Sequence, residues 1–320
     1  VDLDVLLVEL ESGRRGFGRG EPHQGGSRPD QRLVLEDLAD VRVVLAHERR
    51  EPPDRLELLV AVGLGGELAC VLGDVLEPAL TEEHGFVLDF DTIPNDVADR
   101  ARMLILNYPH NPTGGVCDLA FYEKAVAWCH DHRVLLVSDI AYSELGFSED
   151  TQPPSVFQAT GAREVAVEFQ SLSKSHNMAG WRTGFAVGGP EVILNLGRVK
   201  SNVDFSLFGG IQMAAVEALT GTQKICADNR ALYEHRRNLV VAGYRELGWE
   251  VPSPPATLYV WARIPPAWGD DDFSFVTEVF NKSGVLLSPG SGFGINGKGY
   301  VRTSLVVDDA RIRRVMELLQ

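Results

Sequence analysis

The sequence predicts an α/β protein built on a mostly parallel β-sheet. Short apolar runs at 103–107 (MLILN) and 134–139 (VLLVSD) have the length and composition of buried strands. Between them, residues 119–132 (LAFYEKAVAWCHDH) show the spacing of an amphipathic helix. Strand, helix and strand in this order form the unit from which parallel sheets are built. Further strands are expected at 165–173 and 184–188.

The remainder of the chain predicts a helical stretch followed by a second, smaller α/β layer. Helices are expected at 190–201, 208–219 and 223–247, and after them strands at 257–265, 285–288 and 299–306 and helices at 272–283 and 308–319. We therefore expect a large domain over 75–250 and a small C-terminal domain over 251–320.

The first 85 residues differ in composition from the rest of the chain. They contain one aromatic residue, Phe17, and no lysine, although the 320 residues include 14 Phe, 7 Tyr and 5 Trp. Residues 11–32 are rich in Gly, Arg and Pro and show no period, which indicates loop or disorder. Only 32–46 and 56–72 look periodic enough for helices. Residues 1–74 are therefore expected to form an atypical N-terminal segment.

Charge and cysteine content exclude several function classes. The formal net charge of −15 argues against a nucleic-acid partner, because phosphate binding relies on Lys and Arg. The four cysteines show neither C-x-x-C spacing nor a disulfide framework, so we expect no metal site and a reducing cytoplasm. Asp2 and Asp4 stand where a signal peptide needs positive charge, and the nearby apolar run is too short to span a bilayer, so we expect neither export nor a membrane anchor.

A serine-rich turn with one lysine follows the expected strand at 165–173. Lys174 could form an imine with an aldehyde if burial or neighbouring cations disfavour its charged form. The hydroxyls of Ser171 and Ser173, with the guanidinium of Arg182, could hold a phosphate group. Taken alone, a lysine in such a turn is usually a surface residue.

Asp139 ends the expected strand at 134–139, and Tyr142 follows it. Ligands of parallel α/β sheets bind outside the carboxyl ends of the strands, so Asp139 lies where a ligand is expected. A carboxylate there could keep a pyridine nitrogen protonated, and Tyr142 could donate to a ring oxygen. In the alternative interpretation, Asp139 caps a turn and Tyr142 packs in the core.

Two further residues could contact the same ligand. Asn111 lies in the turn Asn-Pro-Thr-Gly after the strand at 103–107, and could donate to the same ring oxygen. Arg302 lies inside an apolar strand, where arginine is rarely unpaired, and its planar guanidinium suits a carboxylate. A simple turn and a structural salt bridge are the alternatives.

Four blocks resemble a known family. NYPHNPTGG, SDIAYSELGF, SLSKSHNMAGWRTGFAVG and YVRTSLV are similar to blocks of the class I/II aminotransferases, the fold-type I enzymes that use pyridoxal 5'-phosphate. The resemblance covers roughly residues 75–320 and implies the aspartate aminotransferase-like fold. Within the family, EEHGFVLDFDTIP and the YVWARIP block look most like LL-diaminopimelate aminotransferases and the neighbouring alanine and aspartate aminotransferases.

The resemblance implies a catalytic role for Lys174, Asp139 and Tyr142, and a cofactor contact for Asn111. Lys174 corresponds to the Schiff-base lysine, which also moves the proton, and Asp139 to the partner of the pyridinium nitrogen. Tyr142 and Asn111 correspond to the donors to the phenolate oxygen of the cofactor.

The same resemblance assigns the binding of phosphate and substrate. Ser171, Ser173 and Arg182 correspond to phosphate ligands, and Arg302 with Asn111 to the substrate contacts, of which Arg302 anchors the α-carboxylate. The implied activity is ping-pong transfer of an amino group from an amino acid to a 2-oxo acid, in a homodimer. Two alternatives are a β-lyase or regulatory protein of the same fold, and a catalytically silent remnant that acts as a structural or partner-binding protein.

Two segments of the family pattern are missing. Family members carry a Gly-Ser/Thr-rich helix start that binds the phosphate, and a Pro-Gly-Tyr-Pro segment whose aromatic ring stacks on the cofactor. Residues 56–73 (LELLVAVGLGGELACVLG) contain no aromatic residue, serine or threonine. The composition of the N-terminal quarter suggests a shifted reading frame joined to an aminotransferase frame near residue 70, which would impair activity.

Overall fold

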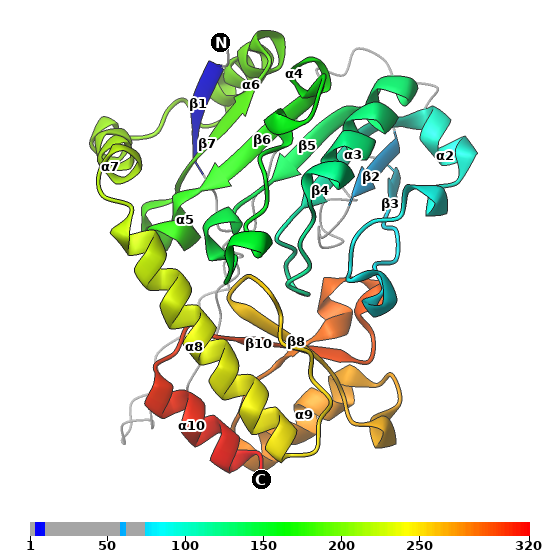
Figure 1. Ribbon diagram of the computed structural model, residues 1–320, viewed down its shortest axis with the longest axis vertical. Coiled ribbons are helices and arrows are strands. Elements are labelled where there is room, and N and C mark those ends of the chain that lie inside the picture. The colour runs from blue at the N-terminus through cyan, green and yellow to red at the C-terminus, as the bar shows by residue number, and fades with distance from the viewer. Residues whose placement is uncertain (1–3, 10–57, 62–73) are drawn as a thin grey trace, which may run out of the picture.

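Two β-sheets, one above the other in Figure 1, organise the chain. The computed structural model describes residues 4–9, 58–61 and 74–320. In this part of the chain the larger sheet has seven strands in the order β1-β7-β6-β5-β4-β2-β3, and the smaller has three in the order β8-β10-β9. The two sheets therefore provide two separate cores.

The larger sheet is mixed and mostly parallel. Its strands are β1 (Asp4–Glu9), β2 (Leu58–Ala61), β3 (Asp74–Leu76), β4 (Ala101–Asn107), β5 (Leu135–Asp139), β6 (Ala166–Ser171) and β7 (Thr183–Gly188). Strands β2 to β6 pair in parallel, whereas β7 pairs antiparallel with both β6 and β1. The carboxyl ends of β4, β5 and β6 consequently meet at one edge of the sheet.

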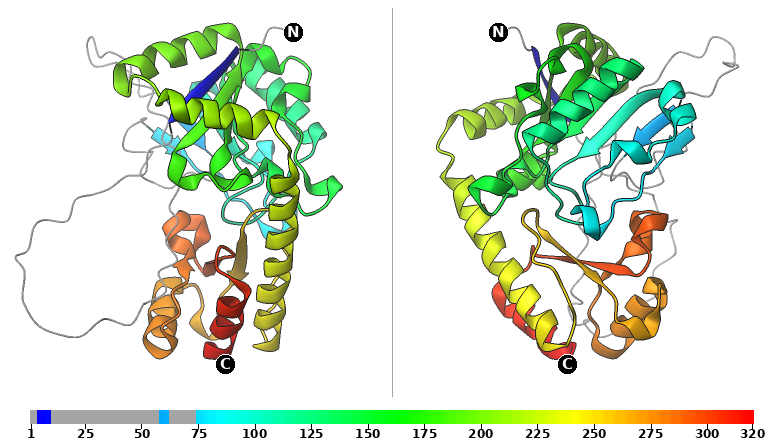
Figure 2. Two further views of the ribbon diagram at one scale, coloured as in Figure 1. Left: turned by 90° about the vertical axis from the view of Figure 1, so that its left-hand side faces the viewer. Right: turned by 45° about the vertical axis from the view of Figure 1, so that its right-hand side comes forward.

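Helices cover the larger sheet and connect it to the smaller one. The helices are α2 (Asn95–Arg100), α3 (Leu119–His132), α4 (Ala162–Val165), α5 (Leu172–Ser175), α6 (Pro190–Val203), α7 (Gly209–Thr220), α8 (Lys224–Glu246), α9 (Asp272–Ser283) and α10 (Asp309–Leu318). Helix α8 runs along one side of the molecule, from the large sheet to the small one, in both views of Figure 2.

Both faces of the large sheet are buried. Leu104 and Leu106 of β4 are fully buried in the cluster that includes helix α3, whereas Ile105 between them packs on the opposite face with Val137 and Ile193. Successive side chains of a strand point to opposite faces, so an uninterrupted apolar run is the composition that a doubly covered parallel strand requires.

The smaller sheet is antiparallel and has its own core. Strand β10 (Tyr300–Ser304) lies between β8 (Tyr259–Arg263) and β9 (Ser288–Pro289). Val260, Ala262 and Val301 pack with Val240 and Tyr244 of α8. The same helix thus belongs to the small core at one end and approaches the large sheet at the other.

The structure agrees closely with the elements expected after residue 75. The helices at 119–132 and 272–283 have the expected bounds, and most of the other strands and helices differ by a few residues at their ends. The strand expected at 285–288 is wrong over 285–287, because β9 comprises only Ser288–Pro289. Lys174 lies on the one-turn helix α5 rather than in an open turn. The division of the chain into domains at 75 and 251 stays a prediction.

The helix expected at 56–72 is wrong over Leu58–Ala61, which form strand β2. A short apolar run fits a buried strand as well as a helix, and pairing with β3 and β4 decides between them. Strand β1 was not expected either. The helix expected at 32–46, the loop at 11–32 and the proposed frame shift lie outside the described residues.

None of the helices in the described residues is long and apolar enough to cross a membrane.

We predict that Leu104→Ala lowers the free energy of unfolding by about 2–5 kcal/mol, because it leaves a cavity in place of a fully buried side chain. Leu194→Ala is the matched control, since Leu194 is 56% exposed on α6. Denaturant unfolding monitored by circular dichroism measures both variants. Equal, small effects of the two substitutions would contradict the buried position of β4.

Candidate active site

Asp139 lies at the carboxyl edge of the large sheet, as the sequence predicts. It ends β5 and pairs with Asn107 of β4 on one side and Phe169 of β6 on the other. One carboxylate oxygen accepts a hydrogen bond of 3.0 Å from the Ala141 amide. Burial raises the pKa of Asp139 to about 6, and the hydrogen bond from Ala141 acts in the opposite direction. This carboxylate therefore lacks a positively charged partner among the described residues.

Asn107 fixes the loop that carries Asn111. Its side-chain oxygen accepts from the Asn111 amide at 2.9 Å, and its side-chain nitrogen donates to the Asp139 carbonyl at 3.2 Å. Asn107 is almost completely buried, so both bonds are shielded from water. The Asn107 side chain thus ties the ends of β4 and β5 to the loop that carries Asn111.

Arg302 of the small sheet reaches this loop. Its guanidinium donates to the Asn111 side-chain oxygen at 2.9 Å, and its central carbon lies 4.1 Å from the centre of the Tyr259 ring and 4.5 Å from that of Phe293. Cation–π contacts of this kind hold a guanidinium in place without neutralising it. Among the described residues Arg302 has no carboxylate partner, so the structure does not show the alternative of a structural salt bridge.

Tyr142 belongs to the same cluster. Its hydroxyl lies 3.4 Å from that of Tyr259, whose ring contacts Arg302. Burial raises the pKa of Tyr142 well above its usual value, Tyr259 and Asp139 raise it further, and Arg302 lowers it. The phenol is therefore neutral and able to donate a hydrogen bond at physiological pH.

Lys174 follows the next strand. Helix α5 begins directly after β6, and the Ser171 hydroxyl caps it by accepting from the Ser173 amide at 3.2 Å. Only 6% of the Lys174 surface is exposed, yet its amine forms no hydrogen bond or ion pair with another described residue. The Ser173 hydroxyl is buried and has no hydrogen-bond partner in the described part of the chain.

Arg182 is brought close to Ser171 by strand pairing. Ser171 pairs with Gly184, two residues beyond Arg182, and α5 packs against the 3-10 turn Ala179–Trp181. One nitrogen of the guanidinium donates to the Ala179 carbonyl at 3.0 Å. The backbone of Arg182 has a φ of 52°, the left-handed region, which turns the chain sharply into β7.

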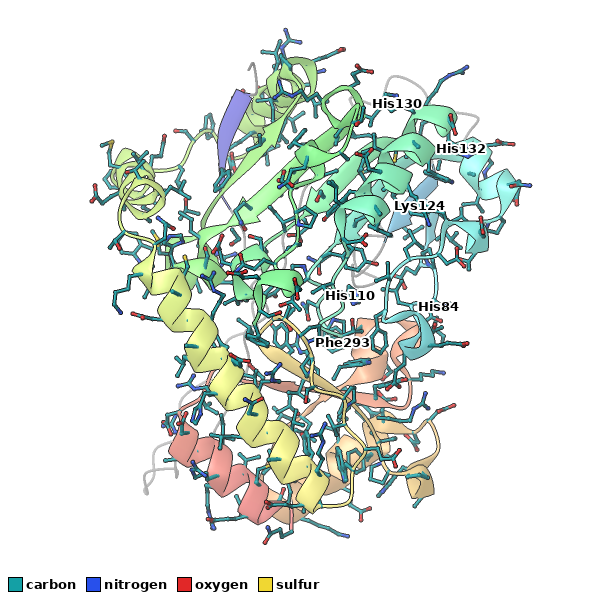
Figure 3. The ribbon with its side chains drawn as sticks, viewed as in Figure 1. His84, His110, Lys124, His130, His132 and Phe293 are labelled. Atoms are coloured by element: carbon teal, nitrogen blue, oxygen red, sulfur yellow. The ribbon has the colours of Figure 1, made fainter. Side chains whose placement is uncertain are left out.

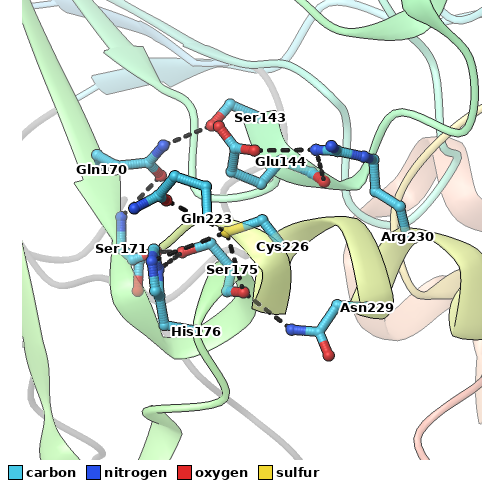
Figure 4. A network of polar contacts seen from close by, with 10 residues as sticks. All are labelled: Ser143, Glu144, Gln170, Ser171, Ser175, His176, Gln223, Cys226, Asn229 and Arg230. Atoms are coloured by element: carbon cyan, nitrogen blue, oxygen red, sulfur yellow. Dashed lines mark hydrogen bonds and ion pairs between the residues drawn. The ribbon is translucent and has the colours of Figure 1, made fainter. Parts of the chain in front are cut away.

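Helix α8 holds the two loops of the site together, as Figure 4 shows. Asn229 donates to the Ser175 carbonyl at 2.8 Å, directly after Lys174. Arg230 donates to the carboxylate of Glu144 at 3.0 Å, in the turn after Tyr142. The Gln170 side chain also donates to the Ser143 hydroxyl. The lysine loop and the Asp139–Tyr142 loop are therefore tied to one helix and to each other.

The structure thus brings the predicted residues together in two groups at one sheet edge. Asn111, Asp139, Tyr142 and Arg302 form the first group, and Ser171, Ser173, Lys174 and Arg182 lie on β6, α5 and the start of β7. Lys174 forms no hydrogen bond with the first group in the described part of the chain.

Three residues of the site were not predicted from the sequence: Asn107, Tyr259 and Phe293. Asn107 carries a local signal, since it is a polar residue at the end of an apolar strand next to Asp139 in the sheet. Tyr259 and Phe293 contact Arg302 within the small layer, through the pairing of β8 with β10 and the turn Gly290–Phe293 after β9, and no pattern in the sequence indicates these contacts.

The family model for aminotransferases of class I and II matches residues 72–319. The LL-diaminopimelate aminotransferase of Halothermothrix orenii is 44% identical over 248 residues, which cover 78% of this chain and 63% of that protein. The enzyme of the same name from Nitratidesulfovibrio vulgaris is 42% identical over 257 residues, with coverage of 80% and 64%. The chain therefore spans just under two thirds of the length of these relatives.

Solved structures give the same result for the fold. Substrate-bound BacF from Bacillus subtilis superposes with a TM-score of 0.78 at 34% identity, over 82% of this chain and 68% of that one. A variant of Thermus thermophilus aspartate aminotransferase gives a TM-score of 0.76 at 26% identity, over 83% and 69%. The expected aspartate aminotransferase-like α/β fold is confirmed.

We predict that Asp139 makes the stability of the ligand-free protein depend on pH. Its folded-state pKa of about 6 exceeds the ordinary 3.8, so stability is lost as pH rises between these values, by up to about 3 kcal/mol. Asp139→Asn removes this dependence. Urea unfolding of both proteins at about pH 4 and about pH 7.5 measures it. If the free energies of unfolding of the two proteins changed with pH in parallel, burial of the ionised Asp139 carboxylate would not destabilise the folded protein, and the prediction would be wrong.

Proposed function

Because the chain belongs to the class I and II aminotransferase family, we propose that it transfers an amino group between an amino acid and a 2-oxo acid. Members of this family depend on pyridoxal phosphate. The observation that carries the proposal is a buried lysine that has no partner among the described residues, at the same sheet edge as a buried carboxylate and an arginine that no described carboxylate neutralises.

The residues of the site fit the cofactor. A buried hydroxyl without a partner costs free energy unless a ligand supplies the missing hydrogen bond, and the Ser173 hydroxyl finds no partner in the part of the chain that the structure describes. With Ser171 and Arg182 it suits the phosphate group. Asp139 would complement a protonated ring nitrogen, and this positive charge would offset the cost that now raises the pKa of the carboxyl. Tyr142 and Asn111 would contact the ring oxygen.

When bound, the cofactor supplies the aldehyde that accepts the amino group and a ring that draws electrons from the substrate. The residues of the chain do the rest. Lys174 would hold the cofactor covalently and would move a proton at the substrate α-carbon. Arg302 orients the substrate through its carboxylate, and the aromatic rings of Tyr259 and Phe293 exclude water from the guanidinium.

LL-diaminopimelate is the first amino donor to test, since curated relatives at 42–44% identity carry that activity in their names. The identity and the shared family support a common reaction. The substrate of this chain depends on the residues that line its substrate pocket.

A second copy of the chain is the proposed partner. Phe205, Phe208 and Met213 are 80%, 75% and 68% exposed at and before helix α7, on the outer side of the large sheet in Figure 1. Exposed apolar side chains gathered on one short segment are typical of an interface.

The free thiols of Cys117, Cys129 and Cys226 support a reducing compartment, and we propose the cytoplasm.

Lys174→Ala is predicted to reduce amino transfer by about 10²-fold or more, because it removes the group that moves the proton. It should also abolish the visible absorption band expected when pyridoxal phosphate is added to the wild-type chain. Lys124→Ala is the control, because Lys124 is exposed on α3, where Figure 3 labels it, and belongs to neither group of site residues.

The assay distinguishes the alternatives. A wild-type chain that shows the visible band but releases ammonia and pyruvate instead of transferring the amino group is a β-lyase. Neither band nor turnover would reject the proposal and favour a silent remnant. Full turnover of Lys174→Ala would reject the role given to this lysine.

Dimer formation is predicted to depend on the exposed aromatic residues before α7. Phe208→Asp should shift the sedimentation coefficient in analytical ultracentrifugation from dimer to monomer, because it places a charge in an apolar interface. Phe273→Asp is the matched control, since Phe273 is 68% exposed on α9 in the small layer. A wild-type chain that sediments as a monomer would contradict the proposed partner.

A further inference from the structure

The helix that carries Lys174 is too short to satisfy its own backbone. Helix α5 comprises only Leu172–Ser175, and the last carbonyl groups of a helix have no partner within it. The Leu172 carbonyl accepts from the His176 amide at 3.1 Å. The Ser175 carbonyl belongs to a buried residue, and the side chains that donate to it come from helix α8. The end of this turn therefore depends on a helix that is distant in the chain.

Asn229 of α8 contacts the end of the turn with both atoms of its carboxamide. Its Nδ2 donates to the Ser175 carbonyl at 2.8 Å, a contact drawn in Figure 4, and its Oδ1 accepts from the Asn177 side chain at 3.0 Å. The backbone of Asn177 has a φ of 56°, in the left-handed region that costs energy for residues other than glycine. One side chain thus holds the residues on both sides of His176, where the chain leaves α5.

Burial makes this contact costly to lose. Only 4% of the Asn229 surface and 2% of the Ser175 surface are exposed, so water does not readily replace the carboxamide. A buried carbonyl that loses its donor retains the cost of its desolvation. The thiol of Cys226, three residues earlier on α8, lies 3.6 Å from the same carbonyl, but a thiol is a weak donor. Asn229 is therefore the stronger of the two donors that α8 provides.

The direction of the Lys174 side chain depends on the backbone of this turn. The side chain is buried, and its amine forms no hydrogen bond or ion pair with another described residue. A long side chain without a polar partner at its tip takes its direction from its backbone and from packing. Ser175 is the next residue in the chain, so a shift of the Ser175 carbonyl moves the backbone from which the lysine extends.

We infer that Asn229 is a positioning residue for Lys174, and that its hydrogen bond to the Ser175 carbonyl fixes the direction in which the lysine amine meets the cofactor aldehyde and the substrate α-carbon. The inference rests on the proposed aminotransferase function, because that function gives the amine an aldehyde and a proton to reach. Asn229 acts through the lysine turn and takes no part in the chemistry itself. Its loss should therefore weaken the reactions of Lys174 more than the binding of substrate.

Hydrogen exchange of the full chain without cofactor, followed by mass spectrometry, tests the contact itself. Asn229→Ala should raise exchange in the peptide 172–178 about tenfold, the size expected for one buried hydrogen bond. Asn229→Asp keeps the shape of the side chain and the acceptor for Asn177 but replaces the donor to Ser175, so it should raise exchange at least as much. Asn238→Ala is the matched control, since Asn238 is exposed on the same helix, and it should leave this peptide unchanged.

Cofactor affinity separates a role through the lysine from a general effect on folding. Equilibrium dialysis should show that Asn229→Ala binds pyridoxal phosphate about tenfold more weakly than the wild-type chain does. In a Lys174→Ala background, which cannot form the imine, the same substitution should change the affinity by less than about twofold. In turnover, Asn229→Ala should lower kcat about tenfold and change KM by less than about twofold, because Arg302 still binds the substrate carboxylate.

All variants are compared well below the lowest of their thermal midpoints, so that partial unfolding does not enter. Unchanged exchange of the turn in Asn229→Ala, wild-type affinity and turnover in Asn229→Asp, or an equal loss of cofactor affinity in both backgrounds would overturn the inference. The last of these outcomes would show that Asn229 supports the fold and not the lysine. A wild-type chain that binds no cofactor would reject the proposed function and the inference with it, whereas the three outcomes above leave the proposed function standing.

Discussion

The row formed by Asn107, Asp139 and Phe169 across three parallel strands determines where the site lies. Parallel strands that end level with one another deliver their following loops to the same sheet edge. The loop with Asn111, the loop with Tyr142 and the helix with Lys174 all begin there. Asn107 and Asp139, and likewise Asp139 and Phe169, are far apart in the chain but become neighbours through strand pairing.

This arrangement has a cost in the absence of a ligand. The same edge contains a carboxylate with a raised pKa, a buried hydroxyl that no other described residue contacts by a hydrogen bond, and a buried amine. Each disfavours folding, and the two packed cores offset them. The sheet fixes the geometry of such a site before a ligand binds. Binding therefore requires little reorganisation of the protein. The apolar packing of the two cores thus holds the polar groups of the site in position before a ligand binds.

The sequence was most informative where local pattern and tertiary structure agree. The β4–α3–β5 unit follows from two apolar runs and one amphipathic stretch, and Asp139 follows from its place at the end of a strand. Strand β2 was misassigned because four apolar residues fit either structure until partner strands are known. The rings around Arg302 were beyond prediction, since their contacts depend on the pairing of β8 with β10 and on the turn after β9, which the sequence pattern does not reveal.

Helix α8 makes the two layers mechanically dependent on each other. Its first half binds Ser175 through Asn229 and Glu144 through Arg230, and its second half is part of the small core. A continuous helix is stiff, because its hydrogen bonds run along its axis. A rotation of the small sheet would therefore move helix α8 and, with it, the turn that carries Lys174. The separation of the two layers and the orientation of the Lys174 amine are therefore coupled to each other.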